Sequence, residues 1–66
     1  MTKPATFSGA KLEAARERAN LTRAELAEKV GISRQMVRYL EQGSQPGYDV
    51  ACRLADALGI GVEKFR

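Results

Sequence analysis

The chain of 66 residues contains no histidine, no tryptophan and a single cysteine, Cys52. One cysteine cannot form an internal disulfide, and without histidine it cannot build a zinc site, so we expect no metal and no cofactor. No serine or cysteine stands at a suitable spacing from a catalytic base, and no glycine-rich loop is present to hold a phosphate. The sequence therefore predicts a protein that is not an enzyme and has no small-molecule ligand.

Long apolar runs are also missing. Arg53 and Asp56 interrupt the most apolar stretch, which is therefore too short to span a membrane. The first four residues lead into no apolar segment of the kind that a secretory signal requires. We expect a cytoplasmic protein with no membrane partner.

Charge and length describe one small folded domain. Eleven Lys and Arg against eight Asp and Glu leave a net charge of +3, which favours a polyanionic partner only weakly. Apolar residues make up 44% of the chain and charged residues 29%, as in ordinary globular proteins. We expect a flexible N-terminal arm over residues 1–7 and a single domain over residues 8–66.

Apolar residues recur at spacings of three and four and never alternate over a useful length, so the sequence predicts an all-α fold. Ser8 is the expected N-cap of the first helix and Ser33 that of the third, while Thr22 and Glu25 form a capping box that begins the second. Five short helices are expected: residues 9–19, Thr22 to Gly31, about 33–42, 48–58, and a final turn at 62–66 that returns Phe65 to the core. Ala19 should face inward, as should Tyr48.

The second and third expected helices are separated by only three residues. Two helices can cross so closely only if the contact residue is small, the turn tolerates a positive φ, and the second helix supplies apolar anchors. Ala27, Gly31, Val37 and Leu40 meet these requirements in order. The sequence therefore predicts a helix-turn-helix at this point.

The exposed face of the third helix carries the functional prediction. At 100° per residue, an arc of about 140° contains five polar or aromatic side chains: Arg34, Gln35, Arg38, Tyr39 and Gln42. Arginine suits the O6 and N7 acceptors of guanine, and glutamine suits N6 and N7 of adenine. This composition favours a surface that reads base edges in double-stranded DNA.

The segment "LTRAELAEKVGISRQMVRYLEQG", with "KLEAARERAN" before it and "LADALGI" after it, resembles the lambda repressor/Cro-type (XRE-like) helix-turn-helix family. The resemblance covers about residues 11–65. It implies a compact five-helix fold and a transcriptional repressor that binds a short palindromic operator as a homodimer, in the cytoplasm and at the nucleoid when bound.

Site residues follow from the same resemblance. Arg34, Gln35 and Tyr39 occupy the usual base-reading positions, and Arg23 stands where the family commonly has a phosphate-binding glutamine. It further implies a structural ion pair, partly buried, between Arg16 and Glu41. The loop over residues 42–47 departs from the pattern because it contains no Lys or Arg.

Arg38 is expected to contact bases or phosphate, although it could instead pair with Glu41. The expected phosphate contacts come from Arg23, Ser33 and Gln42, and Lys3 in the arm could also reach DNA.

The C-terminal end is the expected dimer surface, because Ile60, Val62 and Phe65 exceed what so small a core can hide. The alternative class is a protein-interaction module such as an antitoxin, in which DNA binding would be autoregulatory.

Overall fold

The computed structural model describes residues 7–66 and is all-helical there, which confirms the predicted class. Four α-helices are followed by one 3-10 helix: α1 (Gly9–Arg18), α2 (Arg23–Val30), α3 (Arg34–Glu41), α4 (Tyr48–Leu58) and η1 (Val62–Phe65). The expected fifth helix is thus a single 3-10 turn. In the part of the chain with defined structure, no helix is long and apolar enough to cross a membrane. The expected arm lies outside this part, apart from Phe7.

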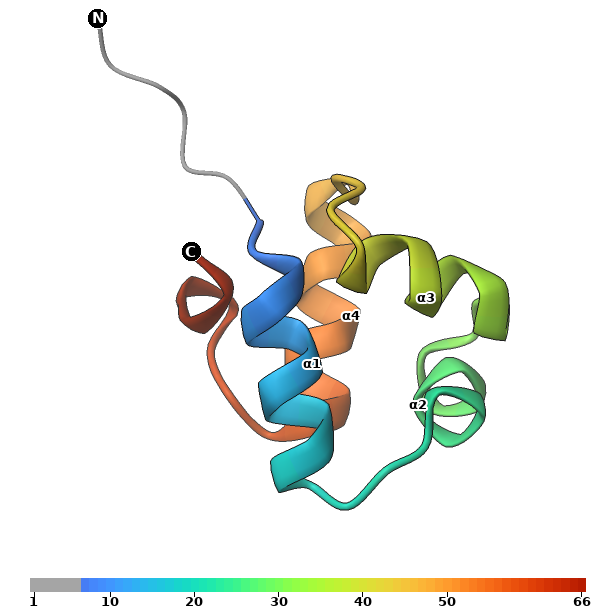
Figure 1. Ribbon diagram of the computed structural model, residues 1–66. Coiled ribbons are helices and arrows are strands. Elements are labelled where there is room, and N and C mark those ends of the chain that lie inside the picture. Colours follow the sequence, from blue (N-terminus) through green and yellow to red (C-terminus); the bar gives the residue numbers. More distant parts are fainter. Residues whose placement is uncertain (1–6) are drawn as a thin grey trace, which may run out of the picture.

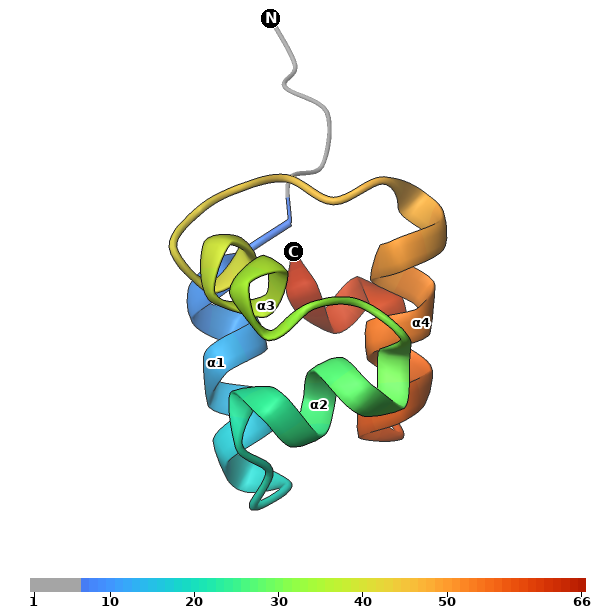
Figure 2. The same ribbon diagram turned by 90° about the vertical axis from the view of Figure 1, so that its right-hand side faces the viewer.

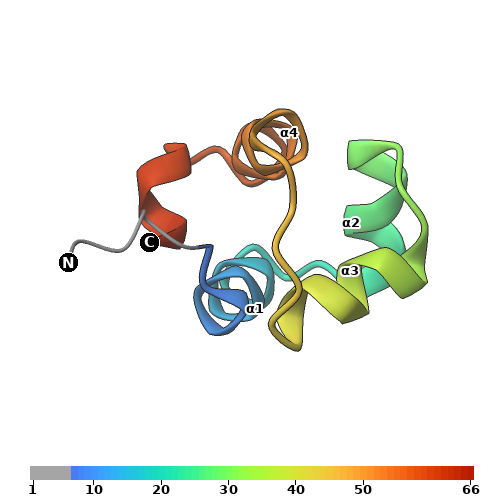
Figure 3. The same ribbon diagram turned by 90° about the horizontal axis from the view of Figure 1, so that it is seen from above.

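The elements form a closed ring (Figures 1 and 2). α2 packs on α3, α3 on α1, α2 on α4, and η1 on both α1 and α4. Seen from above, α2 and α3 lie on one side of the molecule and η1 lies on the opposite side (Figure 3). The folded molecule therefore has an α2–α3 end and an η1 end, and α1 and α4 lie between them.

The interior of the ring is the hydrophobic core. Six side chains are essentially inaccessible to solvent: Phe65, Leu12, Leu26, Leu40, Leu54 and Val37. They come from all five elements, so no element can leave without exposing apolar surface. Burying a side chain of this size contributes about 1.5–3 kcal/mol.

Local signals set the helix boundaries. The Ser8 hydroxyl accepts a hydrogen bond from the Lys11 amide and caps α1. Gly31 ends α2 with a φ of 86°, a left-handed conformation that is costly for residues with a β-carbon. Asn20, just after α1, also adopts a positive φ, of 61°. These are positions at which a helix end was expected.

The start of α1 touches the end of α3 through a glycine. A β-carbon built on Gly9 would lie 2.4 Å from the carbonyl oxygen of Leu40 and 2.6 Å from that of Glu41. Because the obstacle is backbone, it cannot move aside as a flexible side chain would. Gly9 is therefore what allows α1 and α3 to approach this closely.

Three expectations about burial or domain boundaries are wrong. Ala19 is exposed because α1 has already ended at Arg18. Tyr48 is 75% exposed, since it begins α4 beyond the edge of the core. Phe7 is not part of an arm: its ring lies 4.9 Å from that of Phe65, and its amide donates to Gln45 Oε1 at 2.9 Å.

Phe65 itself is 1% exposed, so it cannot form a dimer surface as expected. The ring of elements does have room for it, because η1 closes over the gap between α1 and α4 and turns this side chain inward. The amide of Ser8 donates a hydrogen bond to the Phe65 carbonyl, which joins the N-terminal and C-terminal segments of the described chain.

Candidate nucleic-acid interface

α3 has one buried face and one open face. Val37 is 0% exposed and Leu40 1%, and these two anchors fix the rotation of the helix. The opposite face leaves every predicted base-reading side chain exposed: Arg34, Gln35, Arg38 and Tyr39, with Gln42 directly after the helix. The structure therefore brings the predicted set together on one surface.

Two of these side chains are already joined. Gln35 Nε2 donates to the Tyr39 hydroxyl at 2.7 Å, one helical turn away. The bond holds the Gln35 amide along the helix, and within residues 7–66 the side-chain oxygen of Gln35 accepts no hydrogen bond. Tyr39 is 46% exposed, so the pair stays accessible to a partner.

The start of α3 is fixed by Ser33, whose hydroxyl accepts from the Met36 amide at 2.9 Å. The start of α2 is fixed by a complete capping box: the Thr22 hydroxyl accepts from the Glu25 amide at 3.0 Å, and Glu25 Oε1 accepts from the Thr22 amide at 2.8 Å. Both caps were predicted from the sequence. They set where the two helices begin relative to the open face.

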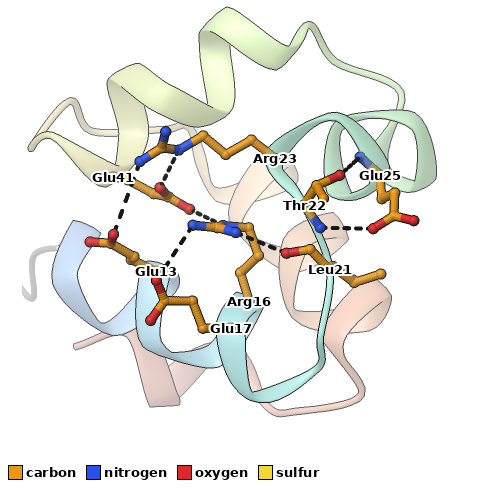
Figure 4. Close-up of polar contacts among 8 residues, drawn as sticks. All are labelled: Glu13, Arg16, Glu17, Leu21, Thr22, Arg23, Glu25 and Glu41. Carbon is orange, nitrogen blue, oxygen red and sulfur yellow. Dashed lines mark hydrogen bonds and ion pairs between the residues drawn. The ribbon is translucent and has the colours of Figure 1, made fainter.

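A carboxylate shared by two arginines lies under the end of α3 (Figure 4). Glu41 Oε2 accepts from Arg16 Nε at 2.6 Å, and Glu41 Oε1 accepts from Arg23 Nε at 2.8 Å. The Glu41 side chain is 2% exposed and that of Arg16 is 11%. Arg16 Nη1 also donates to the Leu21 carbonyl at 2.8 Å. One buried acid thus joins α1, the loop before α2, the first residue of α2, and α3.

Arg23 is the open member of this cluster. Its side chain is 41% exposed, and its Nη2 lies 4.0 Å from Glu13 Oε2. The hydrogen bond to Glu41, reinforced by the charge of that carboxylate, raises the pKa of the Arg23 guanidinium above its ordinary value. Arg23 was expected as a solvent-facing phosphate ligand, and its attachment to Glu41 was not foreseen.

Three other residues that shape this surface or its support were not predicted from the sequence. Gln45 pairs with the Phe7 backbone in both directions, accepting from the amide at 2.9 Å and donating to the carbonyl at 3.0 Å. Nothing in the sequence signals this bond. The ion pair of Glu13 with Arg23 was also missed. Gly9 was missed too, although a glycine inside the first turn of a helix is a signal that another backbone approaches closely.

The remaining dimer candidates lie away from this surface. Ile60 and Val62 are half-buried, in the linker to η1 and in η1 itself. Figure 3 shows η1 on the far side of the molecule from α3. A contact made there would leave the open face of α3 uncovered.

The sequence matches a family model described as helix-turn-helix over residues 12–65. The chain belongs to this family. The predicted membership of an XRE-like helix-turn-helix family is thereby confirmed. No curated protein sequence matches it.

Solved structures show the same fold as this helix-turn-helix chain. A SinR/SinI protein complex matches with a TM-score of 0.80 at 20% identity, over 86% of this chain and 57% of the other. SinR, the master regulator for biofilm formation, in complex with DNA matches with a TM-score of 0.79 at 21% identity, over 83% and 90%. The chain thus spans little more than half of the first of these relatives.

The fold also occurs within an enzyme. Streptomyces albus HEPD, with 2-hydroxyethylphosphonate and Fe(II) bound, matches 97% of this chain with a TM-score of 0.83 at 24% identity. The match covers only 15% of that protein. At such identities the likeness establishes the fold alone.

Proposed function

We propose that the chain is a sequence-specific DNA-binding regulator whose helix-turn-helix consists of α2 and α3, with α3 reading the major groove. The observation that carries this proposal is the open face of α3. Its rotation is fixed from below by Val37 and Leu40, and its exposed side chains are the donors and acceptors suited to base edges.

Size and shape support the same placement. An α-helix with its side chains is about 10–12 Å in diameter, and the major groove is about 12 Å wide, so α3 can enter it lengthwise with its neighbours at the rim. Arg34 and Gln35 stand at the N-terminal end of the helix, which is the end that contacts bases in helix-turn-helix complexes. Arg38 and Tyr39 follow one turn later.

Phosphate contacts would position the helix without reading sequence. Arg23 and Ser33 begin or precede helices, where unpaired amides and the helix dipole favour an anion. Gln42 follows the last turn of α3. These three residues flank the open face, so they are suited to hold the two strands on either side of the groove.

The regulator acts as a repressor on a short palindromic operator, bound by a homodimer. Two copies would place their recognition helices about 34 Å apart, one turn of B-DNA. The SinR structure that contains DNA shares the fold, which supports the class of ligand. Of the expected dimer surface, Ile60 and Val62 remain as candidates.

Selection of bound duplexes from a random pool, at a stated physiological salt concentration, tests the proposal directly. Enrichment of one motif is the expected outcome, and a palindromic motif with 2:1 stoichiometry would support the dimer. Recovery of an unenriched pool would contradict sequence-specific binding.

A pair of variants then separates the two kinds of contact. Arg34→Ala should weaken binding to the selected duplex by about 1–3 kcal/mol and leave a scrambled duplex almost unaffected. Arg23→Ala should weaken both duplexes alike and reduce the salt dependence by about one unit of slope. Equal losses of Arg34→Ala on both duplexes would remove Arg34 as a base reader.

A further inference from the structure

We propose that Glu41 is a positioning residue for DNA binding: it holds the Arg23 guanidinium by its Nε so that the two Nη groups face a backbone phosphate. The proposal rests on the proposed function and assigns this carboxylate a role beyond its ion pair with Arg16. It concerns how the phosphate contact is kept in register with the base contacts of α3.

Arg23 is held by a short hydrogen bond at its Nε, and by a longer ion pair with Glu13 at its Nη2. Its Nε donates to Glu41 Oε1 at 2.8 Å, while its side chain remains 41% exposed. Among residues 7–66 neither Nη nitrogen makes a hydrogen bond, and the ion pair of Nη2 with the half-exposed Glu13 is long, at 4.0 Å. The guanidinium is planar, so fixing Nε also fixes the plane in which the Nη donors lie. Those donors are the ones that a phosphate would accept from.

Glu41 is a rigid support for this contact. Its side chain is 2% exposed and its second oxygen is bound by Arg16 at 2.6 Å. Arg16 in turn binds the carbonyl of Leu21, two residues before Arg23. The same buried group therefore fixes both the backbone from which Arg23 extends and the end of its side chain (Figure 4).

The consequence is a fixed distance between two kinds of DNA contact. Arg23 begins α2, and Glu41 ends α3, whose open face carries the base readers. Joining the two residues sets the phosphate contact relative to the base contacts before DNA arrives. An arginine that is already ordered also loses less side-chain freedom on binding than a free one.

Charge alone and positioning predict opposite effects on DNA affinity when the Glu41 carboxylate is removed. Glu41→Gln deletes a negative charge close to the DNA-binding surface, and on charge alone that should tighten binding to a polyanion. Positioning predicts weaker binding, because Arg23 is released. The sign of the change therefore distinguishes the two.

The experiment is a double-mutant cycle on the duplex selected above, measured as equilibrium affinity at several salt concentrations. Glu41→Gln should weaken binding roughly tenfold in the wild-type background and cause no further loss in Arg23→Ala. Glu13→Gln is the matched control: it removes the same charge beside the same guanidinium, from an exposed and more distant carboxylate. It should leave affinity equal or slightly higher.

A second variant avoids any weakening of the fold. Arg23→Lys keeps the charge and leaves the pair between Arg16 and Glu41 intact, but a single ammonium cannot bind Glu41 on one edge and a phosphate on the other. It should lose nearly as much affinity as Arg23→Ala. Wild-type affinity in Arg23→Lys would overturn the proposal.

The remaining outcomes are equally decisive. If Glu41→Gln tightens binding, or weakens it equally with and without Arg23, Glu41 acts only through charge or through the fold, and the proposal is wrong. Thermal unfolding of each variant gives the folded fraction used to correct its affinity. If wild-type protein selects no duplex at all, it is the proposed function that fails.

Discussion

The α2–α3 end of the molecule and the opposite end, at η1, are held by different interactions. At the α2–α3 end both helices begin with a side-chain cap, Thr22 and Ser33, and the buried carboxylate of Glu41 joins three elements. α4, which connects the two ends, and η1 at the other end both have glycine N-caps, Gly47 and Gly61, so neither has a side-chain cap hydrogen bond. The η1 end has an apolar centre, the fully buried ring of Phe65, and its polar contacts include hydrogen bonds to the backbone of Phe65 and Phe7.

The difference matches what each end has to do. Hydrogen bonds are directional, so caps and ion pairs fix the positions of α2 and α3 within narrow limits. Apolar burial depends on area and is tolerant of small shifts. The end proposed to meet DNA is therefore the end whose geometry is specified by polar contacts in addition to its share of the core, which includes Leu26, Val37 and Leu40.

The largest effect should come from the apolar end. Phe65→Ala removes a fully buried ring that packs on Phe7 at 4.9 Å, and it should cost about 3–5 kcal/mol of unfolding free energy. For a domain of 66 residues this is a large fraction of the expected stability. Urea unfolding measures the loss. Tyr48→Ala, at an aromatic that is 75% exposed, is the control and should change stability little. Similar losses in both would mean that Phe65 is not the centre of this end.

The polar end should follow closely. Arg16→Met keeps the volume of the side chain but leaves Glu41 buried with only one partner, and breaking a buried pair costs about 3 kcal/mol or more. Arg18→Met, at an exposed arginine of the same helix, should be nearly neutral. Denaturant midpoints of the two variants give the difference. A stable Arg16→Met would show that Arg23 alone satisfies Glu41.

The features that could be predicted from the sequence are those that depend on residues close together in the chain. The caps Ser8, Thr22 and Ser33, and the helix-ending Gly31, act on backbone groups a few residues away, so local sequence contains the information. The open face of α3 follows from helical period alone.

What could not be predicted depends on elements that meet only in the folded chain. Phe65 was expected in the core and also on a dimer surface, and only the packing of η1 on α1 and α4 decides between them. The contact of Arg23 with Glu41 spans eighteen residues and depends on how α2 crosses α3. The pairing of Gln45 with Phe7 spans thirty-eight.

A smaller effect should come from the approach of α1 to α3. Gly9→Ala places a β-carbon against backbone atoms of Leu40 and Glu41, and forcing extra volume into such a contact costs about 1–3 kcal/mol. Gly47→Ala is the matched control, because its β-carbon would meet nothing within 4 Å and its φ of −68° suits any residue. Thermal unfolding should separate the two variants. A neutral Gly9→Ala would mean that α1 and α3 can move apart without loss.

The smallest effect transfers a feature of one end to the other. Thr22→Ala removes the cap of α2 and should cost about 1 kcal/mol. Gly47→Ser offers α4 the cap that it lacks, at a position with extended backbone and open space, and should gain about 0.5 kcal/mol. Comparison with Gly47→Ala isolates the hydroxyl, since both variants reduce the freedom of the unfolded chain alike. If Gly47→Ser is no more stable than Gly47→Ala, the start of α4 is set by packing and gains nothing from a directional hydrogen bond. The contrast between the two ends would then be sharper than the caps alone suggest.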